Sequence, residues 1–441
     1  MRAAASPPGG GGGHYVHACG ASLCKPGGGH LRLRGVNLGG WLVTENWLCG
    51  ITDRSDAAAG RFTLETLEER FGAARAGALM DTWYDSFIVA RDFDNIAALG
   101  FNVVRVPFGY RNLQDASRNW KGAPPPLPTC AALWQQPWPR LRAMFVKARP
   151  FDKIHLMQAC HMATVGGAPC APCCAGDAFK RLDWAVAQAK RVGLYVILDY
   201  HVWWGQEQAR SDRTGAEGER VRAGAYDMIN FGSGSAAMKA KQRAHAIELW
   251  RRVLRHYRGE AAVAAVQYLN EPNGGMRGSE FLFKALADED PGRLVIAWGH
   301  PEADGGEWGN VAFGPHIYDA KGRSTGADHA AIAREMAAID GARRAMDVPF
   351  FVGEFHVFGD DKARSRAILA HLLREMNARD VSWTKWTWKG VDVGDWALVN
   401  VKRAARIDAS EDSFEAIADA WAGMGAGEAN DGLQAVLEAA T

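Results

Sequence analysis

The sequence predicts an α/β protein of the (β/α)8 type, a TIM barrel, with a long insert after its second strand. Short apolar runs rich in β-branched and aromatic residues alternate with amphipathic segments, and the alternation repeats eight times. Alternation of this kind is typical of parallel strands joined by helices, and eight such units close into a barrel. Polar and aromatic side chains stand at the carboxyl ends of the apolar runs, where barrel enzymes carry their active sites.

The predicted elements follow one another in regular order along the chain. Glycines at 100 and 193 directly follow two of the predicted helices, as expected for helix C-caps. The predicted strands span 33–38, 101–107, 194–200, 263–270, 293–298, 311–318, 349–354 and 381–388. The clearest helical patterns, with apolar residues three and four apart, span 82–99, 178–192, 237–257, 329–346 and 362–378.

Three regions do not follow the alternation. Residues 1–30 form a Gly-rich N-terminal extension, for which we expect disorder followed by a small hairpin that closes the barrel bottom. The catalytic barrel spans 31–421 and contains an irregular Cys/Pro-rich insert at 112–177, which could be a lid, a disordered segment or an error in the gene model. Residues 422–441 form a C-terminal tail.

Composition excludes several classes of partner. The chain has 51 basic and 50 acidic side chains, so we expect no binding to nucleic acid and an uncharged substrate. No apolar stretch reaches the length of a membrane span, and no signal peptide is visible, which leaves the localisation unknown. Five of the eight cysteines lie in the insert, but their spacing matches no standard zinc finger, so no metal site is predicted. We expect a monomer.

Two glutamates carry the functional prediction. Glu271 and Glu354 each end a short apolar run. Two carboxylates that face each other across a barrel mouth can hydrolyse a glycosidic bond, one as acid and base and the other as nucleophile. We expect the charge of Glu354 to keep Glu271 protonated until the glycosyl ester forms. The alternative is that the two residues are unrelated strand-end glutamates, each paired with a nearby cation.

Other polar side chains are predicted at the same barrel mouth. Arg105 could pair with any nearby acid, or it could hold Glu354 ionised and oriented. His201 and His316 could be core histidines, but two histidines at neighbouring strand ends are better interpreted as hydroxyl-binding groups. The amide of Asn270 can donate to a sugar hydroxyl.

Seven motifs in a fixed order resemble glycoside hydrolase family 5, a group of retaining β-glycosidases on (β/α)8 barrels. The first motif, Arg-Gly-Val-Asn-Leu-Gly-Gly-Trp-Leu, is more similar to the exo-β-1,3-glucanase branch than to the endocellulase branch. The motifs lie at 34–42, 102–107, 198–201, 269–272, 316–318, 352–355 and 386–389.

The resemblance implies a role for each matching residue. Glu271 would be the acid/base and Glu354 the nucleophile, held by Arg105 and Tyr318, and Asn270 would bind the sugar 2-hydroxyl. In addition, His201 and His316 would line the donor site, and a strand-eight tryptophan, Trp388 in preference to Trp386, would form the sugar platform. The resemblance implies no metal or organic cofactor.

The predicted function is hydrolysis of β-glucosidic bonds in a β-glucan or β-glucoside, with retention by double displacement. Trp203 and Trp204 replace a more common Gly-rich loop, which leaves open a glycolipid-directed enzyme of the glucosylceramidase or endoglycoceramidase type. A third hypothesis is a carbohydrate-binding barrel with impaired turnover because the insert obstructs its mouth. Motifs of P-loop proteins, serine esterases and zinc peptidases are absent from the sequence.

Overall fold

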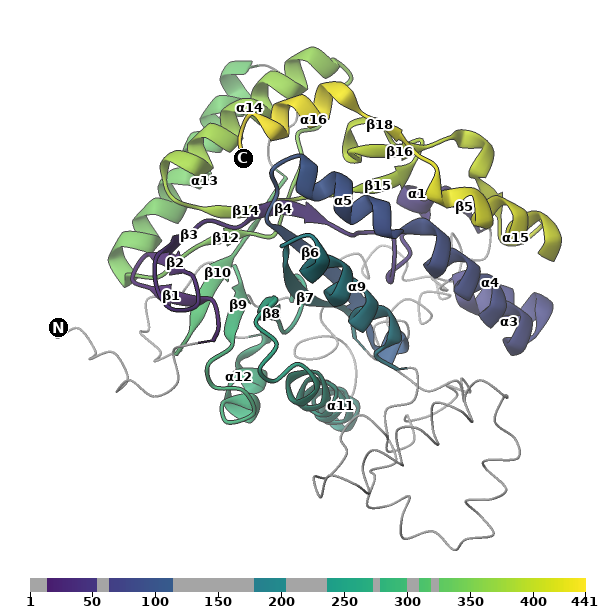
Figure 1. The fold of residues 1–441 in the computed structure, drawn as a ribbon, viewed down its shortest axis with the longest axis horizontal. Helices are drawn as coiled ribbons and strands as arrows, with labels where there is room; N and C mark the ends of the chain where they lie inside the picture. The colour runs from purple at the N-terminus through teal and green to yellow at the C-terminus, as the bar shows by residue number, and fades with distance from the viewer. Residues whose placement is uncertain are drawn as a thin grey trace, which may run out of the picture.

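The computed structural model describes residues 14–53, 63–113, 178–203, 236–272, 278–299, 309–318 and 325–441. Its core is a sheet of eight parallel strands in the order β10-β9-β8-β7-β6-β4-β14-β12. A parallel bridge between Phe313 and Phe350 joins the two edge strands, so the sheet nearly closes on itself (Figure 1). The predicted (β/α)8 barrel is confirmed.

Every predicted strand of the barrel overlaps an observed one. The last two strands before β14 are interrupted: β10 continues as β11 (His316–Ile317), and β12 continues as β13 (Glu354–Phe355). These two extensions pair in parallel with His316 opposite Glu354, which brings two predicted site residues side by side. The barrel strands are β4 (Arg34–Asn37), β6 (Val103–Gly109), β7 (Tyr195–Val202), β8 (Val263–Gln267), β9 (Leu294–Trp298), β10 (Val311–Gly314), β12 (Phe351–Val352) and β14 (Ser382–Lys385).

Helices cover the outside of the barrel (Figure 1). The predicted helix at 82–99 is instead two helices, because the Val89 backbone N–H donates to the Asp92 carboxylate (2.8 Å) and starts a new helix there. The described helices are α1 (Asn46–Cys49), α3 (Thr63–Phe71), α4 (Ala73–Phe87), α5 (Ala90–Ala98), α9 (Lys180–Arg191), α11 (Ala236–His256), α12 (Glu280–Leu286), α13 (Thr325–Met346), α14 (Lys362–Ala378), α15 (Phe414–Ala422) and α16 (Asp431–Glu438).

A small antiparallel sheet closes the bottom of the barrel, as expected for the end of the N-terminal extension. It consists of β1 (His17–Cys19), β2 (Ser22–Cys24) and β3 (His30–Leu31), and a disulfide joins Cys19 to Cys24. Leu23 and Leu31 from this sheet pack into a buried apolar cluster with residues of the barrel strands. The first 13 residues lie outside the described part of the chain.

Short strands join the C-terminal segment to the upper part of the barrel. They are β5 (Ile51–Thr52), β15 (Lys389–Val391), β16 (Val399–Val401), β17 (Ile407–Asp408) and β18 (Glu428–Ala429). Residues 114–177, which include nearly all of the predicted insert and its five cysteines, lie outside the described residues. None of the described helices is long and apolar enough to cross a membrane.

Candidate active site

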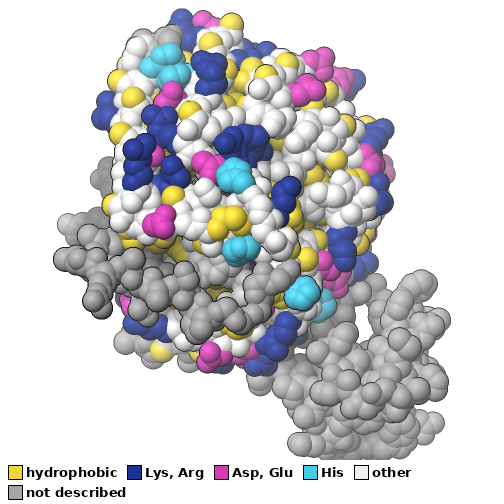
Figure 2. All heavy atoms as spheres, turned by 60° about the vertical axis from the view of Figure 1, so that its left-hand side comes forward, with side chains coloured by type: hydrophobic (Ala, Val, Ile, Leu, Met, Phe, Trp, Pro, Cys, Tyr) yellow, Lys and Arg dark blue, Asp and Glu magenta, His cyan; other side chains and the backbone are white. Residues whose placement is uncertain are grey.

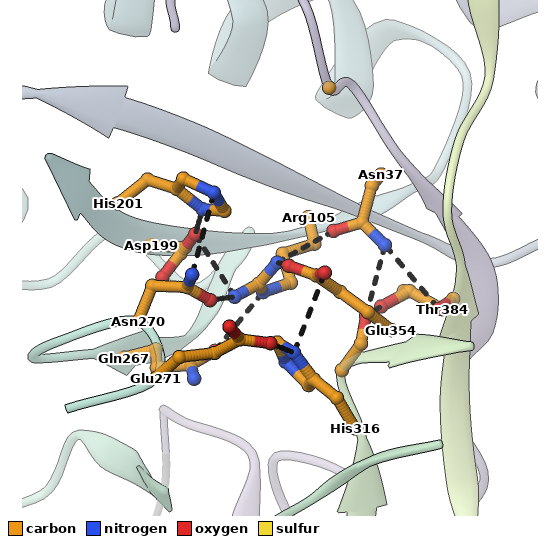
Figure 3. Close-up of polar contacts among 12 residues, drawn as sticks. Asn37, Arg105, Asp199, His201, Gln267, Asn270, Glu271, His316, Glu354 and Thr384 are labelled. Carbon is orange, nitrogen blue, oxygen red and sulfur yellow. Dashed lines mark hydrogen bonds and ion pairs between the residues drawn. The ribbon is translucent and has the colours of Figure 1, made fainter. Parts of the chain in front are cut away.

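The predicted site residues that Figure 3 labels meet toward the carboxyl ends of the barrel strands. Tyr318 joins them through its hydrogen bond to Glu354, and Trp388 is the exception. Arg105 belongs to β6 and His201 to β7, whereas Asn270 and Glu271 follow β8. On the other side, β11 supplies His316 and β13 supplies Glu354. Residues from five separate parts of the sequence therefore form one cluster, because parallel strands all end at the same rim of the barrel.

The two glutamates face each other across His316. The Nδ1 atom of His316 donates to Glu271 Oε1 at 2.6 Å and lies 3.4 Å from Glu354 Oε2. One ligand atom from each of the three residues lies within 4.8 Å of the other two. Glu354 is buried, whereas the Glu271 side chain is 30% exposed. One carboxylate is therefore held inside the barrel, and the other can be reached by solvent and substrate.

Both oxygens of Glu354 have a hydrogen-bond donor. Arg105 Nη1 donates to Oε1, and the Tyr318 hydroxyl donates to Oε2, each at 2.8 Å. Burial raises the pKa of Tyr318, and the negative charge of Glu354 raises it further, so the phenol keeps the proton that it donates. The two bonds fix the carboxylate plane, which is what an attacking nucleophile requires.

Arg105 is fully buried and is surrounded by polar side chains. Three of these partners were not predicted from the sequence. An acid and two amides within apolar strands are nevertheless a usable signal, because such groups are rarely buried unless they are paired. Besides Glu354, the contacts of Arg105 are Asn37 Oδ1 (2.9 Å), Asn270 Oδ1 (2.8 Å), Gln267 Oε1 (3.0 Å) and Asp199 Oδ2 (3.0 Å). The guanidinium thus balances two buried carboxylates and orients three side-chain amides.

His201 lies between Asp199 and an aromatic wall. Its Nδ1 donates to Asp199 Oδ2 at 2.7 Å, and its Nε2 lies 3.4 Å from Asn270 Nδ2. Burial alone would lower the pKa of His201, but the charge and hydrogen bond of Asp199 outweigh it and raise the pKa. Because Nδ1 is bonded to Asp199, Nε2 is the ring atom of His201 that is left to contact Asn270.

The electrostatics of Glu271 differ from the sequence-based expectation. Burial alone would raise its pKa, but the hydrogen bond from His316 and the positive charges of His316, His201 and Arg105 lower it below the usual value. The expectation that Glu354 keeps Glu271 protonated in the free protein is therefore wrong. Its physical reason is that His316 stands between the two carboxylates and supplies a donor to Glu271.

The expected sugar platform, Trp388, does not lie in the site. It is fully buried, and its Nε1 donates to Asp92 Oδ1 (2.8 Å) at the start of α5, outside the barrel. Trp386 instead stacks on His201, with ring centroids 5.6 Å apart and planes 17° apart. Trp386 and Trp388 point to different places because β14 ends at Lys385. The alternation of side chains between the two faces of a strand therefore does not extend to them.

A third carboxylate lies near Glu271 and Glu354 and was not predicted. Glu45 precedes α1 and accepts a hydrogen bond from Trp47 Nε1 at 2.7 Å. Burial raises the pKa of Glu45 to about 6, with a further contribution from the charges of Glu354 and Glu271. The Trp47 ring is 48% exposed and packs edge-on against Trp396 at 4.8 Å. These residues give the mouth an aromatic rim, to which apolar sugar faces can bind.

Glu271, His316 and Glu354 are also the one group of the described residues whose ligand atoms lie close enough to hold a metal ion. In this arrangement the nearest atoms of Glu271 and His316 are bonded to each other, and both oxygens of Glu354 are bonded to Arg105 and Tyr318. The donors are thus already engaged with protein groups, which fits acid–base chemistry by the side chains themselves.

Comparison with known proteins identifies the family. The family model described as cellulase (glycosyl hydrolase family 5) matches residues 168–392, just over half of the chain. The probable glucan 1,3-beta-glucosidase A of Aspergillus niger is 44% identical over 79 residues, and glucan 1,3-beta-glucosidase 1 of Schizosaccharomyces pombe is 40% identical over 81 residues. Each alignment covers 18% of this chain, and the covered shares of the two relatives are 18% and 20%.

Solved structures show a similar fold. The rutinosidase from Aspergillus niger superimposes with a TM-score of 0.52 over 82% of this chain and 91% of its own, at 15% sequence identity. At this identity the likeness concerns the barrel and not the substrate. The chain spans about a fifth of the length of the curated relatives that it matches.

Proposed function

The chain belongs to glycosyl hydrolase family 5, a retaining family, and from this membership we propose that it hydrolyses β-glucosidic bonds in a β-glucan or β-glucoside with retention of anomeric configuration. One observation carries the proposal: oxygen atoms of Glu271 and Glu354 approach within 4.8 Å. Retaining glycosidases have carboxyl groups about 5 to 5.5 Å apart, whereas inverting ones need roughly 6.5 to 9.5 Å to admit a water molecule between them.

In the first step Glu354 acts as the nucleophile. Its carboxylate attacks the anomeric carbon while the bond from that carbon to the leaving oxygen breaks, and Glu271 transfers its proton to this oxygen. Arg105 and Tyr318 orient the attacking carboxylate. Asn270, which Arg105 fixes through Oδ1, is directed toward the sugar 2-hydroxyl. The product is a glycosyl ester on Glu354.

In the second step Glu271 acts as a base. It takes a proton from a water molecule. The oxygen of this water attacks the anomeric carbon on the face opposite Glu354, and the ester bond to Glu354 breaks. His316 stabilises the ionised Glu271 through its hydrogen bond. Because the pKa of Glu271 is lowered, the first step loses its proton donor as the pH rises through that pKa, so hydrolysis of glycans is favoured at acid pH.

Three observations support a glucan substrate. The relatives matched over short segments are named glucan 1,3-beta-glucosidases. The chain carries 51 basic and 50 acidic side chains, and this near balance suits a neutral polysaccharide. His201 and Trp386 offer a polar group and an aromatic face side by side, a combination that suits binding of a sugar ring.

An NMR time course with β-1,3-, β-1,4- and β-1,6-linked glucans and glucosylceramide tests the proposal. We expect release of the β-anomer first, from the β-1,3-glucan above all, and no release by Glu354→Gln. Appearance of the α-anomer first would contradict retention. Cleavage of glucosylceramide alone would favour the glycolipid alternative, and binding of laminarin without any cleavage would favour a binding barrel.

A further inference from the structure

A buried lysine contacts residues that adjoin the site and takes no part in the chemistry above. Lys385 ends β14 and is fully buried. Its Nζ donates to the carbonyl oxygen of Trp386 and, at 3.2 Å, to that of Trp396, and it lies 3.5 Å from His356 Nδ1. Among the described residues, no carboxylate forms an ion pair with it. A buried ammonium with only neutral acceptors is costly, so its presence at this position calls for an explanation.

The contacts of Lys385 connect two walls of the site. Trp386 stacks on His201 in the predicted sugar pocket. The Trp396 ring stacks on His356 at 3.9 Å and lies 6.2 Å from the Tyr318 ring, whose hydroxyl holds Glu354. One ammonium group therefore fixes the main chain of two aromatic residues, one stacked on His201 and the other near Tyr318.

The protonated form of Lys385 matches its surroundings better than the neutral form. An ammonium has three N–H donors, and three acceptor atoms face Nζ. A neutral amine has two N–H donors and a lone pair, so at least one acceptor would face that lone pair. Loss of the proton therefore weakens one of the contacts to Trp386, Trp396 or His356.

The groups around Lys385 place this loss near neutral pH. Burial lowers the pKa of Lys385 to about 7, although the charge of Asp395 on the Trp396 loop raises it in part. Burial, together with the charge of Lys385, lowers the pKa of His356 to about 2, so the imidazole stays neutral and can accept. Asp395 is itself paired with Arg366 of α14 at 2.8 Å. Among the described residues, these are the charged and titratable groups that contact Lys385 or shift its pKa.

We propose that Lys385 is a positioning residue that holds Trp386 and Trp396 against the sugar through their main-chain carbonyl groups, and that it releases them when it loses its proton. The inference rests on the proposed glycosidase function. It assigns a fall in activity on the alkaline side to a group that touches neither the sugar nor the two catalytic carboxylates.

A substrate with a good leaving group separates this effect from the titration of Glu271. The aglycone of 2,4-dinitrophenyl β-glucoside leaves without a proton, so kcat/KM no longer depends on an acid. For the unaltered protein we expect kcat/KM to fall with a midpoint near pH 7, where Lys385 titrates. For Lys385→Met we expect a value about 10- to 100-fold lower at acid pH and no alkaline fall. The variant Lys385→Gln retains N–H donors at every pH and should recover part of the rate, also without the fall.

The control Glu271→Gln should keep the alkaline fall in kcat/KM for this substrate. An unchanged fall in the Lys385 variants, or its disappearance in Glu271→Gln, would overturn the inference. If Lys385→Met does not fold, the Gln variant and a titration of 13Cε-lysine-labelled protein by NMR decide the question, since a Lys385 signal that does not titrate near neutral pH contradicts it. No hydrolysis of the dinitrophenyl glucoside by the unaltered protein would instead refute the proposed function.

Discussion

The two ends of the barrel differ in the side chains that they bury. At the mouth, charged groups are buried: Arg105 and Asp199 are fully enclosed, and Glu354 is nearly so. At the bottom, apolar side chains such as Leu23 and Leu31 fill the interior. Asp380, which lies there, keeps its ion pairs at the surface with His30 and Arg32.

The surface around the bottom of the barrel also carries its charges exposed to water. On the face that carries the N-terminal sheet and α13, charged side chains of both signs are mixed with scattered apolar ones (Figure 2). Water screens such charges, so they contribute little to stability. The comparison suggests that the bottom maintains the fold, whereas the mouth tolerates buried charge because function requires it.

The strongest test of the mouth is Glu354→Gln. We expect kcat to fall on the order of 10⁴-fold or more, because the amide cannot form the glycosyl ester. The melting temperature should change little, since the amide keeps a carbonyl oxygen that can still accept a bond from Arg105 or Tyr318. Steady-state kinetics and calorimetry check both values. Glu438→Gln, at an exposed position on α16, is the matched control and should leave both unchanged.

Arg105→Met should affect both activity and stability. Removal of the guanidinium leaves Asp199 and Glu354 buried without their cation, which costs about 3 to 5 kcal/mol of unfolding free energy. Arg105→Lys restores the charge but not the planar set of donors, so it should regain stability and not activity. If the lysine variant were fully active, the hydrogen-bond geometry of the mouth would have no catalytic importance. Urea unfolding and kinetics measure the two effects.

Leu23→Ala tests the bottom alone. Leu23 is 3% exposed and belongs to the apolar cluster under the barrel, so the cavity should cost about 3 kcal/mol of unfolding free energy. At a temperature where the variant is folded, kcat/KM should equal that of the unaltered protein. A change in kcat/KM beyond twofold would show that the two ends are coupled, and the division of roles drawn above would fail.

The sequence predicted more of the barrel than of its mouth. Strands could be located because burial imposes apolar runs, and the two glutamates proposed to be catalytic were singled out because they end such runs. The network around Arg105 was missed because three of its members, Asn37, Asp199 and Gln267, lie inside strands and meet only after the barrel closes. The periodicity of apolar residues along the sequence does not show which amide side chain will contact which cation.

Local backbone geometry explains the remaining errors. The sequence pattern could not show that the chain leaves β14 at Lys385, so Trp386 and Trp388 could not be told apart. Similarly, the apolar periodicity of 82–99 runs through the break between α4 and α5, which depends on one side chain, Asp92. Both cases depend on single hydrogen bonds or strand ends, which the order of residues does not encode strongly.

His316→Gln sharpens the electrostatic part of the comparison. We expect kcat to fall about 10²-fold, because the substitution removes the imidazole that donates a hydrogen bond to Glu271. The pKa of Glu271 is lowered chiefly by His316 against the opposing effect of burial, so the variant should raise it. Because Glu271 must be protonated to release an oligosaccharide, the alkaline limb of kcat/KM should move to higher pH. A limb that stays in place or moves to lower pH would exclude His316 as the cause.

Asp380→Asn probes the surface ion pairs at the bottom and should have the smallest effect. Burial alone would raise the pKa of Asp380, but bonds from Ser22, His30 and Arg32 lower it overall, so its carboxylate stabilises the folded protein. A lowered pKa means that this stabilisation is complete above the unfolded value of about 3.9 and disappears as the pH falls through the folded value.

We therefore expect Asp380→Asn to cost about 1 kcal/mol at neutral pH and almost nothing at strongly acid pH, because its side chain is 17% exposed and partly screened. Asparagine tolerates the positive φ of 57° at this position, so backbone strain should not contribute. Urea unfolding at both pH values measures the difference, with Asp419→Asn, on the exposed face of α15, as the matched control. An equal cost at both pH values would mean that packing, and not charge, holds the N-terminal sheet to the barrel.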